Sequence, residues 1–507
     1  YSYDEANRLI QVASFLGSVN FGYDRLGHRT SLTYPNGVST GYGYDAMGRL
    51  TGILAQACGG RGRGGTINSF GYTLDAVGNR LSKSVSMVDN GRQDTRYDYT
   101  YDAVYQLLQS VPRGGRGPQD SERYSYDPVG NRLTGPERQD ASRYNEVNEL
   151  VASRKTGYRY DYNGNLTAKD DWTYAYDYEN RLAKATKTES GGIKTVSFKY
   201  DPFGRRIEKR VEEIADGRVE ARTFSYVYDN EDIILEYRTG SDEATDAPRD
   251  RGKVKVSRFV HGLGIDEPLA VEQKGRVYYY HADGLGSIVS LTDQQGRVVQ
   301  SYDYDSFGNM QRRGGEVKQP YGYTGREWDK ELGLYYYRAR YYDPVAGRFI
   351  SKDPIGFSGG DVNLYRYVQN GPVNWVDPLG FELTIAQQAA IRAAAQDWTQ
   401  SQVPYVYGGS SKEGADCSGS VSAIYQQAGV DIGRLSSRGF KTSPLFGPAT
   451  GSPQVGDVGV YPGHVVIYGD DTGVQGRDVW SASHTGGPNF GPANSSWYGT
   501  PTWYRYK

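Results

Sequence analysis

Aromatic and polar residues alternate in short units that recur along most of the chain. In the clearest copies an aromatic residue and one further residue are followed by Tyr-Asp. These copies begin at Tyr1, Phe21, Tyr42, Tyr124, Tyr174, Phe198 and Tyr302. Alternation with a period of two indicates a β-strand, and Asp followed closely by Gly indicates a hairpin turn. Because one hairpin cannot bury its own face, the repeats predict a continuous sheet of stacked hairpins.

The pattern changes after residue 381. The Tyr-Asp units stop, and residues 384–396 are rich in Ala and Gln, which predicts a helix. Farther along, the apolar run Val465–Tyr468 is typical of a buried strand. The chain is therefore expected to be mainly β up to residue 381, with a small α+β domain over residues 382–507.

Composition narrows the classes of protein. The 507 residues carry 58 Lys+Arg against 60 Asp+Glu, which argues against a dedicated nucleic-acid binder. Two cysteines cannot build a disulfide framework or a Cys-rich zinc module. No apolar stretch approaches the roughly 20 residues of a membrane span. Because the first residue is Tyr1 and no leader precedes it, we expect the sequence to begin inside a longer chain.

The repeats resemble the YD repeats of the Rhs family, and the stretch from Gly333 to Gly356, which contains Tyr-Tyr-Tyr-Arg-Ala-Arg-Tyr-Tyr-Asp-Pro, resembles that family's core-ending signature. The resemblance covers about residues 1–381. It implies a YD-repeat β-hairpin shell, or cocoon, over residues 1–332 and a core-ending segment with a self-cleavage element over residues 333–381. It also implies a variable C-terminal toxin inside the shell.

Two Asp-Pro-x-Gly motifs lie at the boundary, at Asp353 and Asp377. Two carboxylates brought together can share one proton and act as acid and base on a peptide bond. Asp-Pro is also ordinary turn chemistry. The Rhs resemblance implies that this pair cuts the protein's own chain, and we predict the cut between Phe381 and Glu382.

The candidate nucleophile of the last domain is Cys417. The spacing of Val421, Ile424, Tyr425 and Ala428 predicts one face of a helix, and Asp416 is a candidate N-cap just before the cysteine. Backbone N–H groups and the helix dipole at a helix N-terminus favour a thiolate. We therefore expect a lowered pKa for the Cys417 thiol.

A nucleophilic thiol needs a base, and His464 stands at the start of the predicted strand. A histidine among apolar residues is more often structural than catalytic, but His464 and His484 are the only histidines in a domain that holds a single cysteine. A cysteine and a histidine joined across a helix and a sheet form the papain-like arrangement, in which the imidazole takes the thiol proton.

These residues resemble the NlpC family of bacterial cell-wall cysteine endopeptidases. The resemblance rests on Pro404-Tyr-Val-Tyr-Gly-Gly409, Asp416-Cys-Ser-Gly419, Gly456-Asp-Val and Gly463-His-Val-Val-Ile-Tyr468. It implies Cys417 as nucleophile, His464 as general base and Tyr405 as a contributor to the oxyanion site.

A third catalytic residue is expected on the strand after His464, where it would orient the imidazole. Alignment by Ala482 favours Ser481, whereas chemistry favours His484. Strand alternation sends the two to opposite faces, so both stay open.

The two resemblances together imply an Rhs-type antibacterial toxin whose shell encloses and releases a papain-like cysteine peptidase. Its implied substrate is the stem peptide of peptidoglycan in the periplasm of a target cell. Its implied partners are a secretion apparatus and a cognate immunity protein. Two alternatives are a Cys-His amidase, deamidase or acyltransferase toxin acting on proteins, and a non-enzymatic adhesin whose YD repeats bind glycans.

No cofactor is expected, and neither is a metal site. Asp457, Asp470 and Asp471 lie near His464 in the sequence, but their spacing matches no common ligand pattern.

Overall fold

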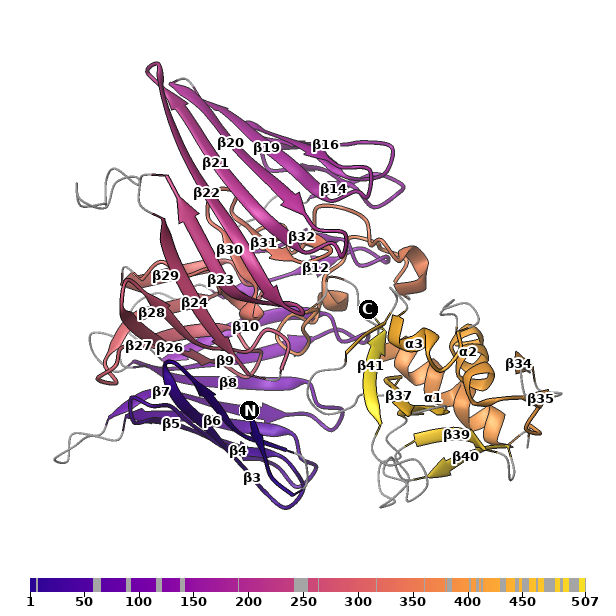
Figure 1. The fold of residues 1–507 in the computed structure, drawn as a ribbon. Helices are drawn as coiled ribbons and strands as arrows, with labels where there is room; N and C mark the ends of the chain where they lie inside the picture. Colours follow the sequence, from indigo (N-terminus) through magenta and orange to yellow (C-terminus); the bar gives the residue numbers. More distant parts are fainter. Residues whose placement is uncertain are drawn as a thin grey trace. The chain divides into compact units, whose positions relative to one another are not determined.

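The structure is a computed structural model. It describes the chain apart from residues 6–7, 58–64, 88–92, 115–120, 137–141, 190, 241–253, 263, 316, 360, 379, 381–384, 401–402, 407–409, 412–413, 429–434, 443–445, 449–455, 462–463, 469–478, 484–486, 492–500 and 507. The chain divides into two compact units (Figure 1). Unit 1 comprises Tyr1–Lys352 and Tyr365–Gly380, and unit 2 comprises Asp353–Leu364 and Phe381–Lys507.

Unit 1 is built from antiparallel strands that pair with their neighbours in chain order. Its first described sheet contains β1 (Ser2–Tyr3), β2 (Leu9–Ser14), β3 (Gly17–Tyr23), β4 (Arg29–Thr33), β5 (Val38–Tyr44), β6 (Leu50–Ala57), β7 (Thr66–Leu74), β8 (Arg80–Met87), β9 (Gln93–Tyr101), β10 (Leu107–Gly114) and β11 (Glu122–Arg123). A hairpin follows, formed by β12 (Ser125–Tyr126) and β13 (Arg132–Thr134).

The second large sheet continues the same meander. It contains β14 (Arg143–Tyr144), β15 (Leu150–Ser153), β16 (Thr156–Tyr160), β17 (Leu166–Lys169), β18 (Trp172–Tyr176), β19 (Leu182–Glu189), β20 (Gly192–Tyr200), β21 (Arg206–Ala215), β22 (Arg218–Asp229), β23 (Asp232–Thr239), β24 (Lys255–His261), β25 (Pro268–Gln273), β26 (Arg276–Ala282), β27 (Ile288–Thr292), β28 (Val298–Tyr304) and β29 (Met310–Gly315). The prediction of stacked hairpins is confirmed.

Each repeat turn satisfies its own polar groups, as the turn at Asp45 illustrates. The Asp45 N–H donates to the Arg49 carbonyl at 3.0 Å, and one carboxylate oxygen of Asp45 accepts from the amides of Met47 and Arg49. The other carboxylate oxygen accepts from Arg49 Nε at 2.7 Å. Gly48 has a φ of 74°, which a residue with a side chain rarely adopts. The Asp-x-x-Gly spacing is thus fixed by the turn itself.

Certain units carry an arginine five positions after the Asp and an aromatic residue three positions before it. In each pair the guanidinium lies over the ring, at 5.0 Å for Arg29 and Phe21, 4.4 Å for Arg80 and Tyr72, 5.5 Å for Arg132 and Tyr124, and 5.5 Å for Arg206 and Phe198.

These four arginines bind parts of unit 1 that lie far along the sequence. Arg29 pairs with Glu267, and Arg80 donates to the carbonyls of Gly284 and Val373. Arg132 donates to the Val345 carbonyl, and Arg206 pairs with Glu327 and Asp329. The early repeats therefore hold the later ones in place through charge-assisted hydrogen bonds.

A small buried sheet follows the repeats, made of β30 (Glu327–Asp329), β31 (Leu334–Tyr337), β32 (Arg340–Asp343) and β33 (Arg348–Phe349). The short 3₁₀ turns Tyr323–Gly325 and Val368–Asn370 flank it, and Gly356–Gly359 forms another such turn in unit 2. The core-ending segment binds repeat turns through their glycine carbonyls: Tyr335 donates to Gly308, Tyr336 to Gly204, Tyr365 to Gly164 and Asn370 to Gly130. The parts of this segment up to Lys352 and over Tyr365–Gly380 are thus integral to unit 1, whereas Asp353–Leu364 belongs to unit 2.

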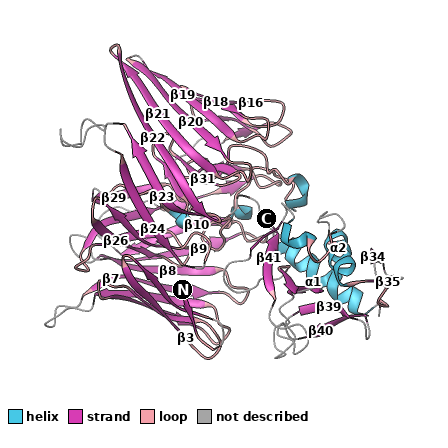
Figure 2. Ribbon diagram, viewed as in Figure 1, coloured by secondary structure: helices cyan, strands magenta, loops and turns pink. Residues whose placement is uncertain are grey.

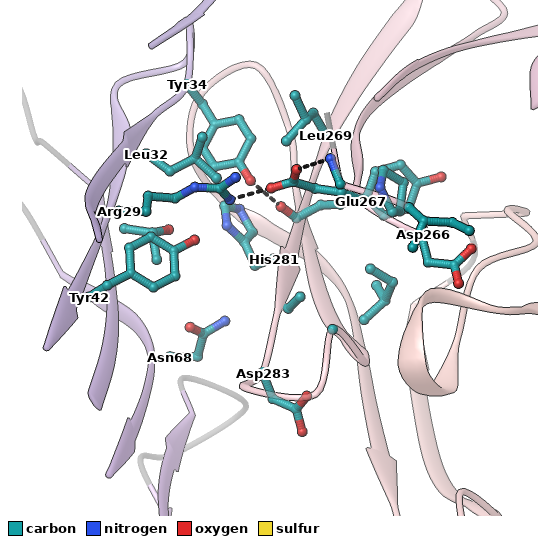
Figure 3. Close-up of a pocket in the computed structure, with 18 residues that line it drawn as sticks. Arg29, Leu32, Tyr34, Tyr42, Asn68, Asp266, Glu267, Leu269, His281 and Asp283 are labelled. Carbon is teal, nitrogen blue, oxygen red and sulfur yellow. Dashed lines mark hydrogen bonds and ion pairs between the residues drawn. The ribbon is translucent and has the colours of Figure 1, made fainter. Parts of the chain in front are cut away.

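A cavity of about 330 Å³ lies between the first sheet and strands β25–β27 (Figure 3). Arg29 and Tyr42 line it from the first sheet, and Glu267 and His281 line it from the other side. Figure 3 shows Glu267 directed toward Arg29, while Asp266 lies on the far side of the same loop.

Unit 2 combines helices with antiparallel strands (Figure 2). Its elements are α1 (Ile385–Gln400), β34 (Ser410–Ser411), β35 (Gly414–Ala415), α2 (Cys417–Gln427), α3 (Gly439–Thr442), β36 (Phe446–Pro448), β37 (Val458–Tyr461), β38 (His464–Tyr468), β39 (Val479–Ser483), β40 (Gly487–Gly491) and β41 (Thr502–Tyr506). The sheet order is β36-β41-β37-β38-β39-β40. Apolar side chains of α1, α2, β37 and β38 share one core. The expected fold class, a mainly β shell region followed by an α+β domain, is confirmed.

Candidate active site

Cys417 is the first residue of α2, and Asp416 caps that helix. The Asp416 carboxylate accepts a hydrogen bond from the Gly419 amide at 2.6 Å and another from the Ser418 hydroxyl at 3.0 Å. Val421, Ile424 and Tyr425 are buried, as the spacing predicted. The cap and the buried helix face are therefore confirmed, and they fix the cysteine at the helix N-terminus.

The Cys417 sulfur contacts the strand that begins with His464. The backbone amides of Val465, of Ser418 and of Cys417 itself lie near enough to this sulfur to lower the pKa of the thiol. Cys417 and Val465 also belong to the same apolar core. The structure thus brings the candidate nucleophile next to the residue that follows the candidate base.

The electrostatics of the thiol differ from the sequence-based expectation. Burial raises the pKa of Cys417, and the charge of Asp416 adds to that effect. The three backbone amides lower the pKa but do not outweigh burial. The predicted lowering of the Cys417 pKa is therefore wrong for the thiol at rest, because the packing of α2 against the sheet removes the sulfur from water.

His464 opens strand β38, as predicted, and is buried with only 5% of its surface exposed. It pairs with Tyr461 across the β37–β38 hairpin, and the two rings lie 6.0 Å apart between centroids. A buried position on a central strand fixes the backbone of His464. Its role as a general base stays a prediction.

Tyr405 lies beside the segment that leads into the cysteine. It forms a parallel bridge with Ala415, and the Val406 amide donates to the Ala415 carbonyl at 3.1 Å. These contacts hold the chain near Tyr405 against Ala415, which lies two residues before Cys417. Its contribution to an oxyanion site stays a prediction.

The third catalytic residue is not settled by the described part of the chain. Strand β39 pairs with β38 at Trp480–Ile467 and Val479–Tyr468, so the strand expected to carry this residue does lie beside His464's strand. Ser481 belongs to β39, whereas His484 lies outside the described residues. Both assignments stay open.

The two boundary aspartates fall in different units. Asp353 belongs to unit 2, where its carboxylate accepts from the Ile355 amide at 3.0 Å and its amide donates to the Leu364 carbonyl. Asp377 belongs to unit 1, is 6% exposed and lies 3.5 Å from Arg340. Their action as a pair stays a prediction, and Phe381 and Glu382, on either side of the predicted cut, lie outside the described residues.

Asp457 is buried, and its carbonyl accepts a hydrogen bond from Tyr468, while Asp470 and Asp471 lie outside the described residues. Among the described residues, no cluster of three or more His, Cys, Asp or Glu side chains could hold a metal ion. A search of the same residues for helices long and apolar enough to cross a membrane found none.

Comparison with known proteins places both parts of the chain. The family described as Teneurin YD-shell matches residues 68–373, more than half of the chain. The chain belongs to this YD-shell family. The RHS Repeat family matches residues 23–55, and the NlpC/P60 family matches residues 402–478, which include Cys417 and His464. The YD-shell protein therefore carries a cysteine-peptidase-like NlpC/P60 region, and both predicted resemblances are confirmed.

Known relatives share the shell region. The double-stranded DNA deaminase toxin A of Burkholderia cenocepacia is 29% identical over 361 residues, covering 67% of this chain and 24% of that protein. The tRNA3(Ser)-specific nuclease WapA of Bacillus spizizenii is 30% identical over 406 residues, covering 78% of this chain and 16% of that protein. The chain thus spans less than a quarter of the length of either relative.

A solved structure of the Photorhabdus luminescens Tc holotoxin pore is similar in fold. It is 21% identical, the alignment covers 76% of this chain and 20% of that chain, and the TM-score is 0.63. The similarity indicates a common YD-shell fold.

Sequence reasoning missed the arginines five positions after the repeat Asp, although the pairing of an aromatic residue at −3 with an arginine at +5 is visible in the sequence. It also missed Arg338 and Arg340, which bind the segment before the predicted cut. The Arg-x-Arg pattern in the core-ending signature was the available signal.

Proposed function

We propose that the protein is the C-terminal part of an Rhs-type antibacterial toxin whose effector is a cysteine hydrolase of peptidoglycan stem peptides. The observation that carries the proposal is the packing of Cys417, the first residue of α2, in one buried core with Val465 of the strand that begins with His464, inside the region that matches the NlpC/P60 family. It brings a nucleophile on a helix N-terminus next to a histidine strand, which is the arrangement that acyl transfer through a thioester requires.

In the proposed reaction, His464 takes the Cys417 proton and the sulfur attacks the carbonyl carbon of a peptide bond. The C–N bond then breaks, and the imidazolium gives its proton to the leaving amine. Water attacks the thioester carbon, His464 takes one proton from it, and the thiol is regenerated with release of a carboxylic acid. Tyr405 would help to stabilise the tetrahedral oxyanion, and Ser481 or His484 would orient the imidazole.

The shell has the role of a container in this proposal. One relative is named a deaminase toxin and another a tRNA nuclease, although both share the shell region with this chain. This supports a common shell that carries different effectors. Delivery to the periplasm of a competitor through a secretion apparatus, and an immunity protein in the producer, complete the proposal.

We also propose that the shell cuts its own chain between Phe381 and Glu382. Asp353 and Asp377 would share one proton, so that one carboxylate activates a water for attack on the Phe381 carbonyl carbon while the other protonates the Glu382 nitrogen. The products are a carboxylic acid at Phe381 and an amine at Glu382. Buried Asp377, held beside Arg340 just before that bond, supports the proposal.

The hydrolase is tested by incubating the purified chain with peptidoglycan sacculi and separating the muropeptides by mass spectrometry. Wild type is expected to produce new peptide termini, and Cys417→Ser is expected to produce none at an unchanged melting temperature. If wild type leaves the sacculi intact but reacts with a protein substrate through Cys417, the result would favour a protein-directed amidase or acyltransferase. Glycan capture by Cys417→Ser and wild type alike, without any hydrolysis, would favour an adhesin.

Self-cleavage is tested by intact mass after expression of the full chain. Wild type is expected to yield fragments 1–381 and 382–507, whereas Asp377→Asn and Asp353→Asn stay whole. Asp361→Asn is the matched control, because Asp361 is another turn aspartate, accepting from the Asn363 amide, of the same region. Equal processing of all these chains would overturn the assignment of the acid pair.

A further inference from the structure

Two arginines project from the tight turn that joins β31 to β32, here called the arginine turn (Tyr337–Arg340). Tyr337 and Arg340 pair directly, so Arg338 and Ala339 form the two-residue loop. Arg338 has a φ of 51°, a conformation that residues with side chains seldom adopt. Such strain persists only where the surroundings fix it, and it concentrates at functional sites.

Both guanidiniums contact the main chain just ahead of the predicted cut. Arg340 Nε donates to the Gly380 carbonyl at 2.6 Å, and its terminal nitrogen lies 3.5 Å from the Asp377 carboxylate. Arg338 donates to the Pro378 carbonyl. The segment from Asp377 to Gly380 is therefore held at a carboxylate and at two carbonyls.

The backbones themselves also meet closely. Gly380 has a φ of 77°, and a Cβ built on it would lie 2.4 Å from the Tyr337 carbonyl oxygen. Since both the conformation and the space exclude a side chain, only glycine fits against the arginine turn. This contact thus explains the glycine of the second Asp-Pro-x-Gly motif.

The arginines are themselves fixed from behind. Arg338 pairs with Asp266 at 2.8 Å, and the same carboxylate also binds Arg326. Burial is the largest single effect and lowers the pKa of Arg338, but the charge and hydrogen bond of Asp266 together with the charges of Glu231 and Asp232 raise it by more in total, so the guanidinium stays cationic. Arg340 stacks over the Phe349 ring at 3.6 Å. The guanidiniums of Arg338 and Arg340 are therefore held in place by these contacts, and binding of the segment Asp377–Gly380 does not have to order them.

We infer that the arginine turn is the positioning element for self-cleavage, with Arg340 setting the place of Asp377 and Arg338, oriented by Asp266, holding the Pro378 carbonyl. This rests on the proposed self-cleavage. A planar guanidinium can bridge a carboxylate and a carbonyl at fixed geometry, which a lysine ammonium cannot. Holding the chain at Pro378 and Gly380 would fix the main chain that leads into the predicted cut, and misplacement by about 1 Å can cost about 100-fold in rate.

The test is a pulse–chase translation of the full chain, with the cleaved fraction followed over time. Arg340→Met and Arg338→Met are expected to slow cleavage about 100-fold, and Arg340→Lys to recover part of the rate. Arg348→Met is the matched control, because Arg348 is an equally buried arginine of the same small sheet that stacks on Tyr365 and donates to the Asn148 carbonyl. It is expected to cleave at close to the wild-type rate.

Cleavage of the Arg338 and Arg340 variants at the rate of Arg348→Met would overturn the inference. A wild-type chain that never cleaves would instead overturn the proposed self-cleavage. In that case the rate of backbone hydrogen exchange in residues 372–380 still tests whether the arginines position this segment. Arg340→Met must exchange faster there than Arg348→Met at matched melting temperature, and equal exchange would reject it.

Discussion

Cys417, in the first turn of α2, packs in one buried core with Val465, the second residue of β38. The contact places the thiol beside the strand that begins with His464. The same packing buries the sulfur and raises its pKa, so the isolated thiol is mostly protonated near neutral pH. Nucleophilic attack at that pH therefore requires a base, and we propose His464 for that role.

This dependence predicts the alkylation rate of Cys417. In a Cys58→Ser background, which removes the other cysteine, iodoacetamide at pH 7 is expected to label Cys417 readily, and His464→Ala to slow labelling about tenfold or more. The rate is measured by intact mass over time. His28→Gln, in a turn of unit 1 where His28 pairs with Asp24, is the control histidine change. Equal rates for wild type and His464→Ala would show that the imidazole does not activate the thiol.

The sequence predicted local features of the site well and its electrostatics poorly. The cap at Asp416 and the buried strand from His464 follow from short-range patterns, which local backbone chemistry enforces. The direction of the Cys417 pKa shift depends on how far the packing of α2 against the sheet removes the sulfur from water. No pattern within the helix carries that information.

The repeat turns show the same limit. Asp201-Pro-Phe-Gly204 and Asp305-Ser-Phe-Gly308 have matching patterns, yet Phe203 is 84% exposed and Phe307 is 0% exposed. The Phe307 ring meets Tyr124 at 4.9 Å and Arg132 at 4.5 Å, contacts between residues more than 170 positions apart. Hairpins are local and were predictable, whereas the way in which distant hairpins pack was not.

That pair of turns gives a stability prediction. Phe307→Ala is expected to destabilise unit 1 by about 3–5 kcal/mol, because it empties a closely packed site. Phe203→Ala, at the same position of its own turn, is expected to change stability by no more than about 0.5 kcal/mol. Urea unfolding of the two variants measures the difference. Similar losses for both would mean that Phe307 is not enclosed by Tyr124 and Arg132.

The buried ion network at Arg206 gives a second stability prediction. Arg206 binds Glu327 and Asp329, and Lys209 also reaches Asp329, at 2.8 Å. Arg206→Met leaves buried Glu327 with only the 3.7 Å pair to Arg326 and buried Asp329 with only Lys209, and it is expected to cost about 3–5 kcal/mol. Arg210→Met, which loses only the exposed pair with Glu212, is expected to cost at most about 1 kcal/mol. Chemical denaturation under identical conditions compares the two, and a small effect of Arg206→Met would argue that the network does not anchor β30.

His281 makes the stability of unit 1 depend on pH. It is 3% exposed, its Nε2 lies 2.9 Å from the Thr292 hydroxyl, and burial lowers its pKa to about 3. An unfolded histidine titrates near 6.5, so between about pH 6.5 and pH 3 the unfolded chain binds a proton that the folded chain excludes. The contribution of His281 to stability is complete above that window and falls with acidification, by about 2 kcal/mol at pH 5. His281→Gln, which keeps a partner for Thr292, is expected to lose about 2 kcal/mol less than wild type between pH 7.5 and pH 5 in urea unfolding. His28→Gln, at a surface turn where His28 pairs with Asp24, serves as the control. If His281→Gln and His28→Gln show the same acid dependence as wild type, His281 does not titrate in this way.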